Sequence, residues 1–98
     1  MTKGNLGRPV LVTTEYRGVF FGYADDTSGD VITLSRARNC IYWTSETGGF
    51  GGLASVGPGK GCRIGARIGK IELRKITSVA EVEPAATEAW ETINVFKG

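Results

Sequence analysis

The stretch Val19-Phe-Phe-Gly-Tyr-Ala24 decides the fold class. Aromatic and β-branched residues favour a pleated strand, and Gly22 in its interior predicts a sharp bend or a bulge. Val10-Leu-Val-Thr-Thr14 comes shortly before it and predicts another strand. The residues between them, 15–18, predict a tight turn in which Gly18 is free to take a positive φ.

More short strands are predicted further along the chain. Segments rich in β-branched residues or with alternating polarity lie at 30–35, 40–43, 70–76 and 78–82. Residues 44–69 predict a long Gly-rich loop, and a loop of that length in a small domain is usually functional or disordered. We predict a mainly β fold, a small SH3-like or Sm-like barrel of four to six short strands.

One helix is predicted at 84–93, beginning with Pro84 in its first turn. Its apolar face has helical spacing and consists of Ala86, Ala89, Trp90 and Ile93. Trp90 is predicted to anchor the helix to the barrel, and the alternative is an exposed tryptophan that binds a partner. Residues 1–8 are polar and are predicted to be flexible.

The chain of 98 residues predicts a single domain, and its net charge of +2 does not by itself indicate a nucleic-acid partner. Basic residues gather in 60–75 and acidic ones in 81–91, which indicates either an interaction surface or two ordinary solvated faces. The small core favours a homo-oligomer. Two cysteines, no signal peptide and no bilayer-length apolar stretch predict a soluble cytoplasmic protein without a membrane partner.

Enzymatic chemistry has little support in the sequence. Histidine is absent, which removes the commonest general base and the usual Cys/His zinc sites. The aspartates of 25–30 do not have the spacing of a calcium loop. We therefore predict a non-enzymatic protein with no catalytic residue, no metal and no cofactor.

The segment Gly48-Gly-Phe-Gly-Gly-Leu-Ala-Ser-Val-Gly-Pro-Gly-Lys-Gly61 is the candidate binding site. It fits neither the P-loop nor the dinucleotide-binding motif in its context. Glycine exposes backbone N–H groups to a ligand, arginine suits phosphate geometry, and aromatic rings suit a base. The predicted ligand-binding residues are Arg36, Arg38, Tyr42, Trp43, Phe50, Gly52, Leu53, Lys60 and Arg63. In the alternative interpretation Tyr42, Trp43 and Leu53 are core residues and the arginines are solvated.

Two resemblances add to this interpretation. Arg17-Gly-Val-Phe-Phe-Gly22, followed by Asp25-Asp26 and Gly29-Asp-Val-Ile-Thr-Leu34, resembles the first motif of Sm-like proteins, which implies a barrel and a ring assembly. The chain departs from the Sm pattern because it lacks the Asp-x-x-Met-Asn element that contacts RNA.

A longer likeness includes Ala37-Arg-Asn-Cys-Ile-Tyr-Trp43 and Gly52-Leu-Ala-Ser-Val-Gly-Pro58 and is similar to a family of small phage and prophage proteins. That resemblance implies a phage or prophage origin and a location in the infected or lysogenic bacterial cell.

Together these observations predict a protein that binds an anionic, nucleotide-like small molecule and sequesters a host anti-phage defence signal. The alternative is an interaction module whose basic 60–75 segment binds nucleic acid or a host protein.

Overall fold

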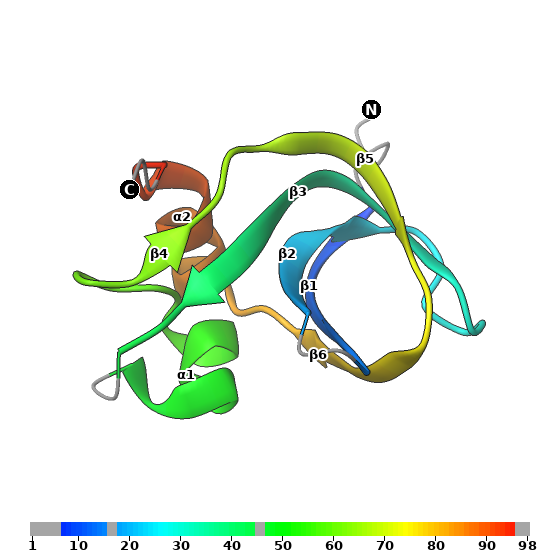
Figure 1. Cartoon of the computed structure of the whole chain (residues 1–98), viewed down its shortest axis with the longest axis horizontal. Helices are drawn as coiled ribbons and strands as arrows, with labels where there is room; N and C mark the ends of the chain where they lie inside the picture. The colour runs from blue at the N-terminus through cyan, green and yellow to red at the C-terminus, as the bar shows by residue number, and fades with distance from the viewer. Residues whose placement is uncertain (1–6, 16–17, 45–46, 96–98) are drawn as a thin grey trace.

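The computed structural model describes residues 7–15, 18–44 and 47–95. Its strands are β1 (Arg8–Thr14), β2 (Val19–Ala24), β3 (Ile32–Tyr42), β4 (Arg63–Ile64), β5 (Ile68–Leu73) and β6 (Ile76–Glu81), and its helices are α1 (Gly49–Ser55) and α2 (Pro84–Thr92). The predicted mainly β class is confirmed (Figure 1).

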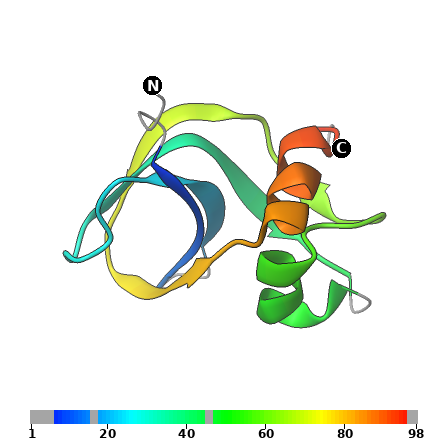
Figure 2. The same cartoon turned by 180° about the vertical axis from the view of Figure 1, so that it is seen from behind.

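All strand pairs are antiparallel, and the strands follow the order β4-β3-β2-β1-β6, with β5 paired to a second stretch of β3. In the described part of the chain β5 and β6 do not pair with each other, so the sheet curls without closing. The closed SH3-like or Sm-like barrel that the sequence predicted is therefore not confirmed. The view from behind shows the same curled sheet with both helices on one side of it (Figure 2).

β3 spans two segments that were predicted from the sequence as separate strands. The predicted strands at 30–35 and 40–43 are parts of one strand, which bends where Arg36 takes a φ of 50°. Opposite this bend the register of β2 shifts between Phe21 and Tyr23. A Cβ on Gly22 would lie 2.8 Å from the Cβ of Leu34, so glycine at this position lets β2 approach β3 closely.

The sheet is buried on both of its faces. Leu11 packs into the cluster that contains the helix residues, whereas Val10 and Val12 pack into a second cluster enclosed by the curled sheet. All three side chains are fully buried, because successive side chains of a strand point to opposite faces and here each face has its own core.

Within the described residues, the range 44–69 includes regular secondary structure, which corrects the prediction of one continuous loop. It contains α1 and β4. Glycine has a low helix propensity, so α1 depends on contacts with the end of the chain described here. The indole Nε1 of Trp90 donates to the carbonyl of Leu53 at 3.0 Å, and the backbone N–H of Glu83 donates to the carbonyl of Ala54 at 2.9 Å.

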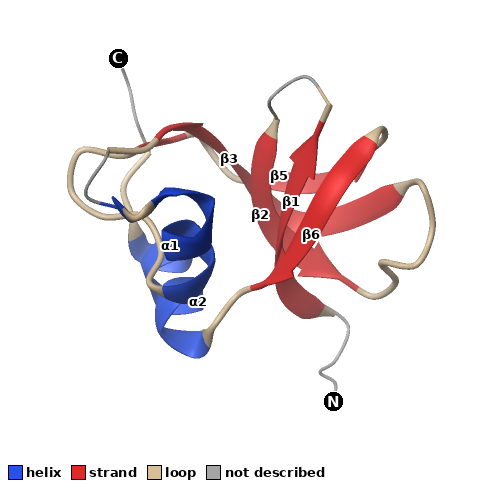
Figure 3. Cartoon of the chain, turned by 90° about the horizontal axis from the view of Figure 1, so that it is seen from below, coloured by secondary structure: helices blue, strands red, loops and turns tan. Residues whose placement is uncertain are grey.

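α2 begins at the predicted Pro84 and ends at Thr92. Trp90 is fully buried and stacks on Phe21, with 5.2 Å between the ring centroids and 4° between the planes. The alternative of an exposed partner-binding tryptophan is therefore wrong. α2 packs beside α1 against one side of the sheet (Figure 3). Within the described residues, neither helix has the length and apolar character needed to cross a bilayer.

Candidate functional site

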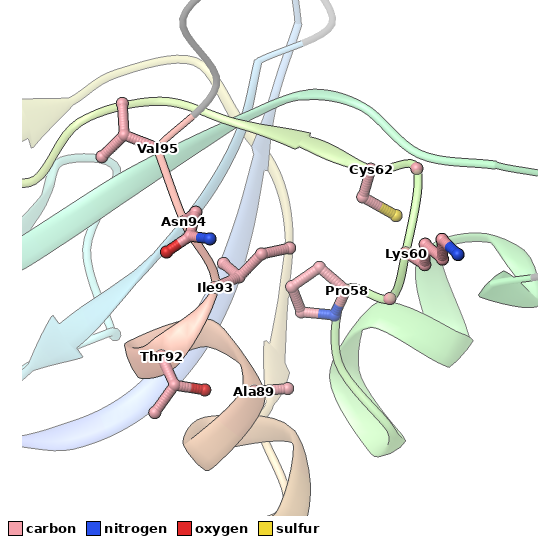
Figure 4. A pocket seen from close by; sticks show the side chains of 10 residues that line it. Pro58, Lys60, Cys62, Ala89, Thr92, Ile93, Asn94 and Val95 are labelled. Atoms are coloured by element: carbon pink, nitrogen blue, oxygen red, sulfur yellow. The ribbon is translucent and has the colours of Figure 1, made fainter.

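A hollow of about 470 Å³ lies between the Gly-rich segment and the end of α2. We call it the Lys60 hollow. Its lining consists of Pro58, Gly59, Lys60, Gly61, Cys62, Ala89, Thr92, Ile93, Asn94 and Val95 (Figure 4). One wall is thus the stretch 58–62, and the other is the last turn of α2 with the residues that follow it.

Two glycines have different roles here: Gly57 directly precedes this wall, and Gly59 belongs to it. Gly57 has a φ of 92°, and a Cβ there would lie 2.6 Å from the Cβ of Ala89 and 2.9 Å from the carbonyl oxygen of Ala86. Glycine at 57 is therefore needed for the segment to pack directly on α2. Gly59, in contrast, lies outside the left-handed region and has no atom within 4 Å of its Cβ position. Neither packing nor backbone conformation requires glycine at 59, and the space beside it stays open.

A turn presents Lys60 to the hollow. The backbone N–H of Cys62 donates to the carbonyl of Gly59 at 3.1 Å, which closes the turn around Lys60. Lys60 is exposed and also lines a smaller neighbouring hollow of about 180 Å³. Among the residues that the structure describes, no carboxylate forms an ion pair with Lys60. Among the described residues that line the hollow, Lys60 is the basic one.

Cys62 adds a half-buried thiol to the same wall. Its Sγ lies 3.3 Å from the hydroxyl oxygen of Thr47. Burial acts to raise the pKa of the Cys62 thiol, but hydrogen bonds from Thr47, Thr44 and Gly59 lower it below its ordinary value. Burial raises the pKa of Cys40, the other cysteine, to about 12. We therefore expect Cys62 to be the more reactive of the two thiols.

The guanidinium group of Arg38 covers the carboxyl end of α2. Arg38 Nη1 donates to the carbonyls of Trp90 at 3.0 Å and Ile93 at 2.7 Å, and Nε donates to Gly65 O at 3.0 Å. The C-terminal carbonyls of a helix carry partial negative charge, and a cation there neutralises it. The charge of Arg38 thus offsets part of the negative potential that the end of α2 contributes to this wall of the Lys60 hollow.

Arg38 is only 3% exposed, so the structure gives it a packing and capping role, away from the lining of the hollow. Burial and then the charge of Arg67 lower the pKa of the Arg38 guanidinium. Its Nη2 atom is buried and has no hydrogen-bond partner in the described part of the chain.

Arg36 belongs to a separate network on the sheet side of α2. The Glu91 carboxylate accepts hydrogen bonds from Arg36 at 3.1 Å, from Arg67 at 2.6 Å and from the Tyr23 hydroxyl. Burial acts to raise the pKa of Glu91, but the Tyr23 hydrogen bond and the two arginines lower it overall. Burial and then Glu91 raise the pKa of Tyr23 to about 12. This network fastens α2 to the sheet.

The predicted aromatic and apolar site residues are spread over three places. Leu53 is fully buried, and Trp43 and Phe50 pack partly buried against the same core cluster. Gly52 lies in α1 against the carbonyl of Thr47. Tyr42 is exposed, with the guanidinium carbon of Arg63 5.4 Å from its ring centroid.

Of the nine predicted residues, only Lys60 lines the hollow. Among the described residues, no group of three Cys, Asp or Glu side chains lies together as a metal site would require. Sequence reasoning missed Cys62 and the stretch 92–95. Cys62 is two residues from Lys60 and could have been included on that ground, whereas no local signal places 92–95 opposite the Gly-rich segment.

The fold and the site define a small, mainly antiparallel β protein with two helices on one side and a surface hollow between a Gly-rich turn and a helix end. The chain belongs to the family described as a domain of unknown function (DUF6948), whose model matches residues 7–90. No curated protein and no solved structure matches the chain.

Proposed function

We propose that this protein is a non-enzymatic binding protein that holds a small anionic molecule in the Lys60 hollow. The observation that carries the proposal is the position of Lys60, an exposed basic residue in the lining of a hollow of about 470 Å³. That volume lies in the range of small-molecule sites, about 300–1,000 Å³.

The chemistry of the lining supports a ligand with one anionic group and a compact apolar body. Pro58, Ala89, Ile93 and Val95 supply aliphatic surface. Polar groups come from Lys60 and from the hydroxyl, amide and thiol of the other lining residues, which suits orientation of a phosphate or carboxylate. Among the residues that the structure describes, no aromatic side chain lines the hollow, so recognition of a base by stacking is not part of the proposal.

The open space beside Gly59 also supports the proposal. Since glycine at 59 serves neither packing nor a left-handed φ, its absent side chain leaves room for a ligand next to the Lys60 turn. The resemblance to phage and prophage proteins supports a role in the bacterial cytoplasm, where the protein would sequester a host defence signal of this anionic class.

The test begins with native mass spectrometry of protein purified from cells, which detects a co-purifying small molecule. Thermal shift with inorganic phosphate, AMP, ADP-ribose and cyclic dinucleotides follows. A ligand at a hundred times its dissociation constant stabilises the fold by about 2.7 kcal/mol. Lys60→Met should abolish the shift, and Gly59→Ala should reduce it by filling the open space.

Lys70→Met is the matched control, because Lys70 is also exposed but lies on β5 outside the Lys60 hollow. It should keep the full thermal shift. If no probe stabilises the protein and no small molecule co-purifies, or if Lys60→Met and Lys70→Met respond alike, the hollow is not the binding site.

The alternative interaction module receives less support from the structure. Within the described residues, at least three of the six basic residues in 60–75 form ion pairs with acids: Arg67 with Glu91, Arg74 with Glu72 and Lys75 with Glu15. These pairs break up the positive surface that a phosphate backbone needs. Steeply salt-dependent binding of DNA or RNA would favour this alternative over the small-molecule site.

A further inference from the structure

A groove of about 480 Å³ lies between the sheet and a side of α2 that the Lys60 hollow does not use. We call it the Glu88 groove, and its lining is Pro9, Tyr23, Val82, Pro84, Thr87, Glu88 and Glu91. The lining residues from α2 have the spacing i, i+3, i+4 and i+7, so they form one stripe along the helix. The view from behind shows α2 and the segment that connects it to β6, which supplies Val82 (Figure 2).

The walls of the Glu88 groove are mainly apolar. Pro9, Val82 and Pro84 line it with aliphatic side chains, and Tyr23 adds an aromatic residue. Small-molecule sites are typically concave, largely apolar and of about 300–1,000 Å³, with a few polar groups that orient the ligand. The groove therefore suits a small molecule with a compact apolar body.

The side-chain hydroxyls of the lining already donate their hydrogen bonds within the protein. The Tyr23 hydroxyl donates to the carboxylate of Glu91. The Thr87 hydroxyl donates to the carbonyl of Glu83 at 3.0 Å. A hydroxyl has one proton to donate, so neither group has a second one for a ligand.

The backbone of the lining offers no donor either. Pro9 and Pro84 have no N–H. The N–H of Val82 donates to the carbonyl of Pro9 at 3.2 Å, and the N–H of Thr87 donates to the carbonyl of Glu83 at 2.8 Å. The other lining residues lie in α2 beyond its first turn or within β2. There the N–H points along the helix axis or within the sheet, and does not face a groove beside the element.

The carboxylates of the Glu88 groove are its charged groups, and they are in different states. Glu91 is held by Arg36 and Arg67, neither of which lines the groove. Glu88 is exposed, and within the described residues no basic side chain forms an ion pair with it. The groove thus presents a negatively charged acceptor next to apolar walls, and its complement is a positively charged donor.

We propose that the Glu88 groove binds a small organic cation, an amine or a guanidine with an apolar body. The apolar body lies between the prolines and Tyr23, and the charged N–H groups donate to the carboxylate of Glu88. A small anion is disfavoured, because the lining has a negative charge and no donor to offer it. This ligand has the opposite charge to the one proposed for the Lys60 hollow, and the two sites share no lining residue. Failure of either proposal therefore does not decide the other.

The test compares probes that share a phenyl ring and differ in charge: phenethylamine, phenethyl alcohol and hydrocinnamate. Backbone amide NMR of the full chain follows each titration and locates the site. Phenethylamine should shift the amide signals of Val82, Thr87 and Glu88. It should bind about ten-fold more tightly than the alcohol, because a charged donor strengthens the bond to a carboxylate. Hydrocinnamate should leave these signals unchanged, and benzylguanidine should bind like the amine.

Glu88→Gln should weaken phenethylamine binding about ten-fold, because it removes the charge and keeps the size of the side chain. Glu83→Gln is the matched control, since Glu83 is also exposed and close in sequence but does not line the groove. It should keep the wild-type affinity. Lys60→Met should also keep it, and Glu88→Gln should leave the response to anionic probes unchanged. Circular dichroism confirms that each variant is folded.

Three results would each overturn the proposal. The first is that neither phenethylamine nor benzylguanidine shifts the groove signals up to millimolar concentration, the range expected for ligands this small. The second is that hydrocinnamate binds as tightly as the amine. The third is that Glu88→Gln and Glu83→Gln have the same effect. Groove signals that move with protein concentration alone, and not with either cation, would assign the groove to a second copy of the chain instead.

Discussion

The contrast between Gly57 and Gly59 gives the sharpest stability prediction. Gly57→Ala places a methyl group 2.6 Å from the Cβ of Ala89 and 2.9 Å from the carbonyl of Ala86, at a residue with a φ of 92°. A left-handed conformation costs a non-glycine residue about 1–2 kcal/mol. Overpacking against a fixed helix adds roughly 1–3 kcal/mol. We therefore expect Gly57→Ala to lower the free energy of unfolding by about 3 kcal/mol.

Gly59→Ala is the matched variant two residues away. Its Cβ meets no atom within 4 Å, and its φ lies outside the left-handed region. Alanine reduces the conformational freedom of the unfolded chain, so this change should raise the free energy of unfolding by about 0.4–1 kcal/mol. The two variants change the same residue type in the same way, and only the surroundings differ.

Urea unfolding monitored by tryptophan fluorescence measures the free energy of unfolding of both variants. The signal should change on unfolding because Trp90 is buried and stacked on Phe21 in the folded protein. For a domain of this size, 3 kcal/mol corresponds to a fall in Tm of roughly 12–24 °C. If Gly57→Ala and Gly59→Ala unfold at the same denaturant concentration, then glycine at 57 is not needed to pack the segment on α2.

Further predictions concern charge and reactivity. Arg38→Met leaves three backbone carbonyls without their donor and should destabilise the fold by roughly 2–4 kcal/mol, with faster amide exchange at the end of α2. Glu91 contributes stability that is present above its ordinary pKa of 4.5 and is lost as the pH falls through its lowered folded pKa. Glu91→Gln should therefore be less stable at neutral pH and lose less stability in acid; equal acid sensitivity in urea titrations would contradict this. Iodoacetamide should label Cys62 well before Cys40, as peptide mass spectrometry can measure.

The β part of the fold follows from local pattern. β1 and β2 begin or end within two residues of the predicted strands, because β-branched and aromatic runs bounded by a turn have few other low-energy arrangements. The bend at Gly22 could also be predicted from the sequence, because a strand interior rarely contains glycine without a close contact.

The helix α1 could not be predicted in this way. Its residues have low helix propensity, and the hydrogen bonds that hold it come from Glu83 and Trp90, distant in sequence. Arg38 was predicted to bind a ligand but is buried beneath the end of α2, for a related reason. Arginine is usually exposed, and only the tertiary structure brings the end of α2 to its guanidinium group. Lys60, on one side of the hollow, could be predicted as a site residue because of its charge. The opposite wall, which includes residues 92–95, depends on how α2 packs against the Gly-rich segment.

The dependence of α1 on α2 sets an order of assembly for the nascent polypeptide. The stretch 49–55 emerges from the ribosome before 84–92. The carbonyls of Leu53 and Ala54 gain their hydrogen-bond donors only after Trp90 and Glu83 have been synthesised. A truncated product that stops before Glu83 should therefore lose α1 and the Lys60 hollow as well as α2, although the strands β1 to β3 retain their own partners.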